Sequence, residues 1–119
     1  NCTGPRFHSV HKFLGEQYQT LLQVIDDVAE RIREVGGQAR GTLTELKMIS
    51  SVVERPGSYP ETSRMLAELM DDHERLQVQI KAILNDLERS GDDPGSVDFL
   101  TSLLKKHEEM GWMLKSHLA

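Results

Sequence analysis

The sequence predicts an all-α protein, and three of its features favour this fold class. Apolar residues recur every three or four positions through three long segments, as on the buried face of an amphipathic helix. Glycine and proline, which interrupt helices, are confined to short stretches between these segments. No segment shows the alternation of apolar and polar residues that is typical of a half-buried strand. The expected architecture is therefore a bundle of packed helices.

The first long helix is expected from about Pro5 to Val35. Proline suits the first turn of a helix, where its missing N–H would have no partner, and Gly36 suits a C-terminal stop. The apolar stripe of this segment consists of Phe7, Val10, Leu14, Tyr18, Leu21, Ile25, Val28 and Ile32. Its spacing predicts one long amphipathic helix.

A short second helix is expected from about Leu43 to Val52, within a crossover. Thr42 and Glu45, three residues apart, form the sequence pattern of a capping box. The third segment also opens with a box, from Ser58 to Glu61, and it carries apolar residues in alternating steps of three and four. These are Leu66, Leu69, Leu76, Ile80, Ile83 and Leu87, with His73 in the same stripe.

The last helix is expected from Ser96, after the turn GDDPG, to the end of the chain. Its stripe contains Leu100, Leu103, Leu104, Met110, Met113 and Leu114, with His107 among them. Histidines at core positions are expected to be buried and hydrogen-bonded, so we assign no metal to His73 or His107. Trp112 and the methionines Met65, Met70, Met110 and Met113 are interpreted as packing residues.

The long connection between the first and third segments predicts that these two helices run parallel, joined by a crossover. We expect one domain, residues 1–119. A complete four-helix bundle needs a further amphipathic helix before Asn1, because the apolar stripes would otherwise leave a large exposed patch. Either the sequence is a fragment or another chain fills the gap.

Composition excludes several classes of function. The formal net charge of -5 gives no general attraction to nucleic acid, and Lys47, Lys105 and Lys106 are too sparse for a DNA groove. DNA binding would depend on a basic tail outside these residues. The single Cys2 cannot form an internal disulfide, no run of about 18 apolar residues could span a membrane, and no export signal is recognisable. A cytoplasmic location is expected.

Three residues of the first helix have the pattern of a divided metal site. Asp26 and Glu30 lie about 60° and 100° around the helix from His11, so all three share one side. However, about 22 Å of helix separates His11 from Asp26, and no single ion could bind both in one copy. Two copies crossing antiparallel near Tyr18 to Thr20 would bring His11 of one against the carboxylates of the other. This arrangement predicts two equivalent sites per dimer.

Motifs along the whole sequence match the pattern of one known protein family. The family pattern runs from an Asn-x-x-Gly-Pro turn through Phe, His and Glu-Gln-Tyr to an Asp-x-x-Ala-Glu-Arg run that ends in Gly-Gly. The matching positions are Asn1, Gly4, Pro5, Phe7, His11, Glu16, Gln17, Tyr18, Asp26 or Asp27, Ala29, Glu30, Arg31, Gly36 and Gly37. The segments PGSY, DDHE, GDD and HEEMGWML also resemble family counterparts, so the similarity covers nearly the whole chain. On these residues the sequence resembles the Dps family (DNA-binding protein from starved cells), the miniferritins.

The resemblance implies a ferritin-like four-helix bundle, of which this sequence has the second, short crossover, third and fourth helices. It implies a homo-oligomeric shell of twelve subunits that oxidises Fe(II), preferably with hydrogen peroxide, and stores ferric mineral. His11 would be the family histidine, with Asp26 and Glu30 the carboxylates lent by the partner. Glu16 would lie near the mineral-nucleating inner surface. Asp93 and Asp98 resemble residues of the three-fold entry pores.

Two departures from the family pattern leave alternatives open. Gly15 stands where the family usually has an acidic ligand one turn after its histidine, and the histidine of the family His-Trp pair would precede Asn1. His8, one turn before His11, could supply nitrogen instead, which would shift the preference from iron towards zinc. The alternative function is a non-catalytic or zinc-binding cage protein. On residues alone, Asp26 and Glu30 also fit a solvated helix face, and Asp93 fits a capped turn.

Overall fold

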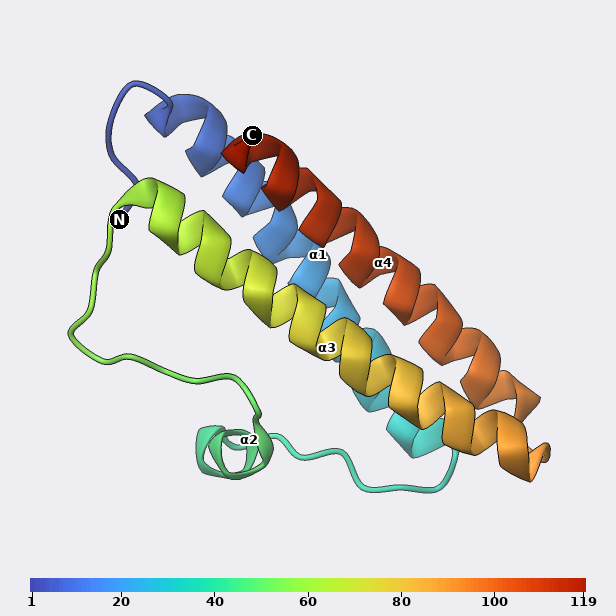
Figure 1. Ribbon diagram of the computed structural model, residues 1–119. Helices are drawn as coiled ribbons and strands as arrows, with labels where there is room; N and C mark the ends of the chain where they lie inside the picture. Colours follow the sequence, from blue (N-terminus) through green and yellow to red (C-terminus); the bar gives the residue numbers. More distant parts are fainter. The chain divides into compact units, whose positions relative to one another are not determined.

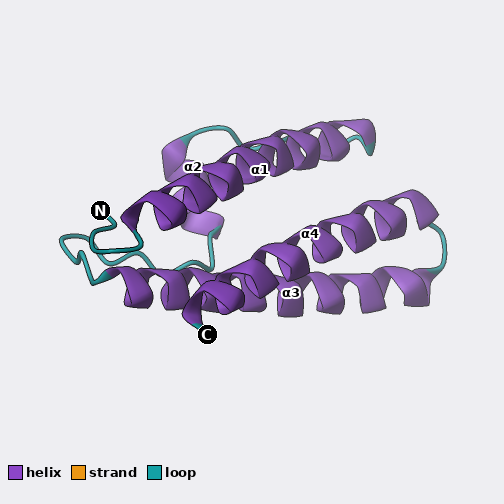
Figure 2. Ribbon diagram, turned by 90° about the horizontal axis from the view of Figure 1, so that it is seen from above, coloured by secondary structure: helices purple, strands orange, loops and turns teal.

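The computed structural model describes residues 1–119 and confirms the all-α fold, with four helices and no strand. In chain order the helices are α1 (Phe7–Glu34), α2 (Leu43–Ile49), α3 (Thr62–Ser90) and α4 (Pro94–Leu118) (Figures 1 and 2). No helix is both long enough and apolar enough to cross a membrane. The chain forms two compact units. One contains residues 8–58, and the other combines residues 1–7 with residues 59–119.

Helix α1 ends one residue before the predicted Val35 and begins two residues after the predicted Pro5. The chain turns at Gly4, whose φ is 95°, and the Phe7 N–H donates to the Gly4 carbonyl at 3.0 Å. At the other end Gly36 has a φ of 86°, and the Gly37 N–H donates to the Ile32 carbonyl at 2.8 Å. A residue in the left-handed helical conformation closes the last turn, and glycine adopts this conformation without steric cost.

Helix α2 has the predicted capping box. The Thr42 hydroxyl accepts from the Glu45 N–H, and the Glu45 carboxylate accepts from the Thr42 N–H, both at 3.2 Å. Hydrogen bonds from Thr42 favour the ionised carboxyl and lower the pKa of Glu45. The helix ends at Ile49, before the predicted Val52, because Ser50 is extended and its hydroxyl accepts the Val52 N–H at 3.1 Å.

The predicted box at the start of α3 is wrong. The Ser58 N–H donates to the Arg55 carbonyl at 3.1 Å in a turn, and α3 begins only at Thr62. Pro60 disfavours helical geometry in the residue before it, so the helix cannot start at Ser58. The N-cap is Glu61, which makes no side-chain capping bond. The helix ends at Ser90, and the following Gly91 is its C-cap, with a φ of 69°.

Helix α4 begins at Pro94 and not at the predicted Ser96. Asp93 is the N-cap, and its carboxylate accepts the Ser96 N–H at 3.0 Å. Proline at the first helical position needs no hydrogen-bond partner and has a φ suited to a helix. The turn GDDPG therefore contains both the stop of α3 and the start of α4.

Helices α3 and α4 pack side by side along their lengths (Figure 1). Most of their buried residues belong to the predicted stripes, namely Leu66, His73 and Ile80 of α3 and His107, Met110 and Leu114 of α4. Leu84 and Gly111 are also buried but were not predicted, and the predicted Ile83 is 48% exposed. The prediction for the histidines is confirmed, since His73 and His107 are 2% and 4% exposed and their Nδ1 atoms lie 2.9 Å apart. Within one chain the core of this unit is thus apolar apart from one imidazole pair.

Trp112 does not pack as the sequence analysis expected, because its side chain is 65% exposed. Met110 and Leu114, on either side of it in sequence, are both buried. Residues two positions apart lie about 160° from one another around a helix, so Trp112 points away from the face that these neighbours bury. Within one chain it contributes little to the core.

The N-terminal segment is hydrogen-bonded to both long helices of its unit. The Thr3 N–H donates to the Thr62 hydroxyl at 3.1 Å, and that hydroxyl donates to the Thr3 carbonyl at 3.2 Å. Arg6 donates from Nη1 to the His117 carbonyl at 2.6 Å, in the last turn of α4. The bond from Arg6 satisfies a carbonyl that the end of a helix would otherwise leave without a partner.

Candidate metal centre

The predicted ligands lie at two separate levels of α1. His8 and His11 are in its first two turns, whereas Asp26 and Glu30 are in its C-terminal half, and all four are exposed. At about 1.5 Å per residue, His11 and Asp26 are about 22 Å apart along the helix. The structure of one chain therefore keeps imidazole and carboxylates apart, on a surface that another molecule could reach.

One copy of the chain has no group of three or more His, Cys, Asp or Glu side chains that could hold a metal ion. A site with the predicted ligands would need a second copy to bring carboxylates to His11. The composition of that site remains a prediction.

The side chains around the carboxylates favour Asp26 over Asp27 as the ligand. Asp27 is half-buried and accepts a hydrogen bond from Gln23 Nε2 at 2.8 Å. Asp26 is exposed, as is Glu30 one turn later. Arg31, the next residue, forms an ion pair with Glu34 at 3.0 Å. Asp26 and Glu30 thus present two oxygen donors on neighbouring turns of α1.

Gly15 lies one turn after His11, and within one chain no contact requires it to be glycine. A Cβ built on Gly15 would meet no atom within 4 Å. Glycine inside a helix costs about 1 kcal/mol relative to alanine, and no packing advantage within the chain offsets this cost. A carboxylate would have room at this position, so the missing ligand is a property of the sequence and not of crowding.

The acidic residues near α4 have distinct surroundings. Asp93 is half-buried and caps the helix, so the capping alternative from the sequence is confirmed. Asp98, one turn into α4, is exposed. A role for either residue in an entry pore stays a prediction, since it depends on three copies meeting.

Glu16, predicted near the mineral surface, is exposed on α1, and its backbone carbonyl accepts a hydrogen bond from the Thr20 hydroxyl at 3.1 Å. Its carboxylate lies one residue after Gly15, on a different side of the helix from His11. The predicted contact of Glu16 with the mineral stays a prediction.

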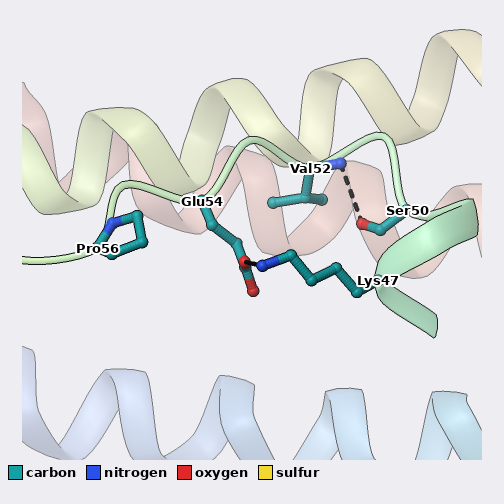
Figure 3. A pocket seen from close by; sticks show the side chains of 5 residues that line it. All are labelled: Lys47, Ser50, Val52, Glu54 and Pro56. Carbon is teal, nitrogen blue, oxygen red and sulfur yellow. Dashed lines mark hydrogen bonds and ion pairs between the residues drawn. The ribbon is translucent and has the colours of Figure 1, made fainter. Parts of the chain in front are cut away.

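A pocket of 350 Å³ lies beside α2 but contains no candidate ligand (Figure 3). Its lining includes an ion pair between Lys47 Nζ and Glu54 at 3.1 Å, with the hydrogen-bonded Ser50 and Val52 next to it. The one carboxylate there is neutralised by lysine and no histidine is present. The pocket therefore does not resemble a transition-metal site.

Comparison with known proteins identifies the family. The sequence model of the Ferritin family, described as a ferritin-like domain, matches residues 1–119. The structure of Dps from Staphylococcus aureus superimposes with a TM-score of 0.89 and 34% identity, over 99% of this chain and 78% of that one. This chain belongs to the Dps family of ferritin-like proteins.

Other Dps proteins agree with this assignment. DpsC from Streptomyces coelicolor has a TM-score of 0.92 and 30% identity, over 98% of this chain and 68% of that chain. A DNA protection during starvation protein 2 of Bacillus anthracis is 37% identical over 79 residues, which are 66% of this chain and 53% of that protein. A low temperature-induced protein of Nostoc, whose function is uncharacterised, is 39% identical over 76 residues, 64% of this chain and 42% of that protein. The chain thus matches about half the length of these two sequence relatives.

Proposed function

We propose that this Dps-family chain is a subunit of a miniferritin that oxidises Fe(II), preferably with hydrogen peroxide, and stores the ferric product inside a hollow homo-oligomer of twelve subunits. Membership of the family supports the iron-storage role. The observation that carries the site assignment is the arrangement of α1, where an exposed imidazole and two exposed carboxylates occupy one side of the helix at levels too far apart for one ion.

Two α1 helices that cross antiparallel near Tyr18 complete both sites. His11 of one chain then meets Asp26 and Glu30 of its partner, and symmetry repeats the arrangement at the other end. Tyr18, Leu22 and Ile25 of α1 are 60%, 44% and 64% exposed in the single chain, so this helix offers apolar side chains for such a contact. The proposed oligomer and the proposed metal site therefore use the same helix.

The donor set suits iron as a substrate. Imidazole nitrogen and carboxylate oxygen are both good ligands for Fe(II), and the negative oxygens stabilise the higher charge of Fe(III). In the overall reaction two Fe(II) ions lose one electron each, the O–O bond of one peroxide breaks, and two protons are taken up to give two Fe(III) and two water molecules. Hydrolysis of Fe(III) to mineral then releases protons. The contribution of this chain is to hold the ions in open coordination, with room for the oxidant.

Glu30→Ala tests the assignment directly. When Fe(II) is added anaerobically and then peroxide, we expect ferric absorbance to rise rapidly in the wild type and at least about tenfold more slowly in the variant, since a direct ligand is lost. Glu88→Ala, an exposed glutamate of α3, is the matched control and should oxidise iron at the wild-type rate. Both variants should elute as the same large oligomer. Equal rates in Glu30→Ala and the wild type would reject the site.

The second candidate function, zinc binding by a cage without ferroxidase activity, has one observation in its favour. Gly15 removes an oxygen ligand, whereas the exposed His8 and His11, three residues apart, can place two imidazoles on neighbouring turns. Zinc accepts nitrogen ligands readily in tetrahedral sites. A nitrogen-rich site of this kind would bind zinc in preference to iron.

Anomalous scattering from crystals soaked separately with iron and with zinc distinguishes the two candidates. If His8 contributes, zinc should occupy a site bounded by His8 and His11, and His8→Gln should reduce zinc occupancy without reducing iron occupancy. Iron bound at His11, Asp26 and Glu30 without His8 would reject the zinc candidate and support the ferroxidase.

A further inference from the structure

A histidine pair joins α3 to α4 inside their shared core. In the whole chain only three polar side chains are buried, which are Gln17, His73 and His107. The Nδ1 atoms of the two histidines lie 2.9 Å apart, with ring centroids at 5.2 Å and ring planes inclined by 48°. That distance is a normal hydrogen bond, so one ring donates its Nδ1–H to the bare Nδ1 of the other. Such a bond requires that the accepting ring be neutral, with a bare Nδ1.

The surroundings of the pair are tightly fitted. Gln77 Nε2 donates to the His107 carbonyl at 3.3 Å. A Cβ added to the buried Gly111 would lie 3.3 Å from that nitrogen and 3.8 Å from His73 Cβ. The absence of a side chain at Gly111 therefore leaves the space that Gln77 and His73 occupy.

No charged group compensates a proton at this position. No Asp, Glu, Lys or Arg is buried anywhere in the chain. The charged residues beside the histidines in sequence are directed elsewhere, because Asp72 pairs with Arg75 at 3.7 Å and Glu108 pairs with Lys81 at 3.8 Å. Glu74 and Lys106, the other two sequence neighbours, are exposed. An imidazolium here would be a buried charge without a counterion, which is strongly unfavourable.

The remaining ring nitrogen of His73 shows which ring donates. His73 Nε2 is buried and has no hydrogen-bond partner. Buried N–H groups without an acceptor are rare, so the favoured tautomer has a bare Nε2 on His73 and its proton on Nδ1, donated to His107. An added proton then has two places to go. On His73 Nε2 it would create a buried cationic N–H without an acceptor. On His107 Nδ1 it would leave two Nδ1–H groups facing each other, neither of which can accept a hydrogen bond.

We propose that the His73–His107 pair is an acid-sensitive latch, which holds α3 and α4 together while both imidazoles are neutral and opens when either takes up a proton. The latch is separate from the proposed metal centre and does not depend on it. It makes the stability of this helix pair respond to pH in the range in which histidines titrate.

The pKa shifts give the pH range. Burial, followed by the proximity of His107, lowers the pKa of His73 to about 4, and burial lowers the pKa of His107. In the unfolded chain a histidine titrates near about 6.5. Between these values the unfolded chain binds more protons than the folded one, so the folded state is destabilised as the pH falls from about 6.5 to about 4. Above that range the latch has its full effect.

The test is urea unfolding of the full chain at pH 7 and pH 4.5, at one protein concentration. From His73 alone, acidification should raise the unfolding equilibrium constant about fiftyfold. The double variant His73→Leu/His107→Leu replaces both rings by apolar groups and should lose this part of the pH dependence. His117→Gln, which removes a histidine outside the core, should retain most of it. A double variant with the same pH dependence as the wild type would overturn the latch.

Nuclear magnetic resonance of ¹⁵N-histidine-labelled wild type gives a second measurement if the double variant does not fold. We expect the His73 ring to stay neutral from pH 7 to pH 5 in the folded protein. His73 should show a protonated Nδ1 and a bare Nε2, whereas His107 should show the opposite tautomer. Titration of His73 near pH 6.5 without loss of structure would contradict the proposal.

Discussion

Mixed oligomers of His11→Ala and Glu30→Ala chains should recover about a quarter of the wild-type ferroxidase rate, although each variant alone is nearly inactive. The reason is the spacing on α1, where His11 lies about 22 Å from Asp26 and about 28 Å from Glu30 along the helix, so each site takes its imidazole and its carboxylates from different chains. With random pairing, half of the dimers contain one chain of each kind. In such a dimer one site receives both intact contributions and the other receives neither, so about one site in four is complete.

The measurement requires unfolding the two variants together, refolding them, and following ferric absorbance after Fe(II) and peroxide are added. A mixture of the two refolded separately is the control, because its oligomers contain one kind of chain and should stay inactive. Refolded wild type sets the full rate. If His11 and Glu30 served one site within the same chain, co-refolding would restore nothing, and the intersubunit arrangement would be rejected.

Leu114→Ala should destabilise the α3–α4 unit by about 3 to 5 kcal/mol. Leu114 is fully buried, with 0% exposure, in the last turns of α4. Removing its branched end loses the transfer free energy of the methyl groups and leaves a cavity that the two packed helices cannot close. Chemical unfolding followed by circular dichroism measures the change in the free energy of unfolding.

Leu114→Met is the matched control, since it nearly conserves volume and should cost less than about 1.5 kcal/mol. A loss for the methionine variant as large as that for the alanine variant would show that the position is sensitive to shape in general and not to a cavity. A loss below about 1 kcal/mol in Leu114→Ala would show that this end of the helix pair is not closely packed.

The sequence predicted the helices well because their signals are local. The spacing of apolar residues depends only on the helical repeat, and the Thr42–Glu45 box and the stops at Gly36 and Gly91 act within one turn. The prediction was wrong at Ser58 because the spacing of Ser58 and Glu61 matches a capping box, but residue types alone do not fix the backbone conformation. Pro60 excludes a helix there, and α3 begins four residues later.

Local sequence patterns predict only part of the candidate metal site. Periodicity places His11, Asp26 and Glu30 on one side of α1. The structure of the chain adds that these three side chains are exposed and that Asp27 accepts a hydrogen bond from Gln23. Neither the periodicity of the sequence nor the fold of one chain determines where a second α1 helix binds. A ligand set divided between chains is a property of the oligomer, and the mixed oligomers of His11→Ala and Glu30→Ala chains test it directly.

By itself the sequence determined the all-α class, the extent of the long helices and membership of the Dps family, because repeat spacing, helix stops and family motifs are properties of the linear chain. The tertiary structure decided how side chains from distant segments meet. It showed that His73 and His107 bond to each other across α3 and α4, that Gly111 makes room for Gln77, and that Trp112 lies outside the core of its chain. These results depend on the rotation of one helix against another, which spacing along a single helix does not specify.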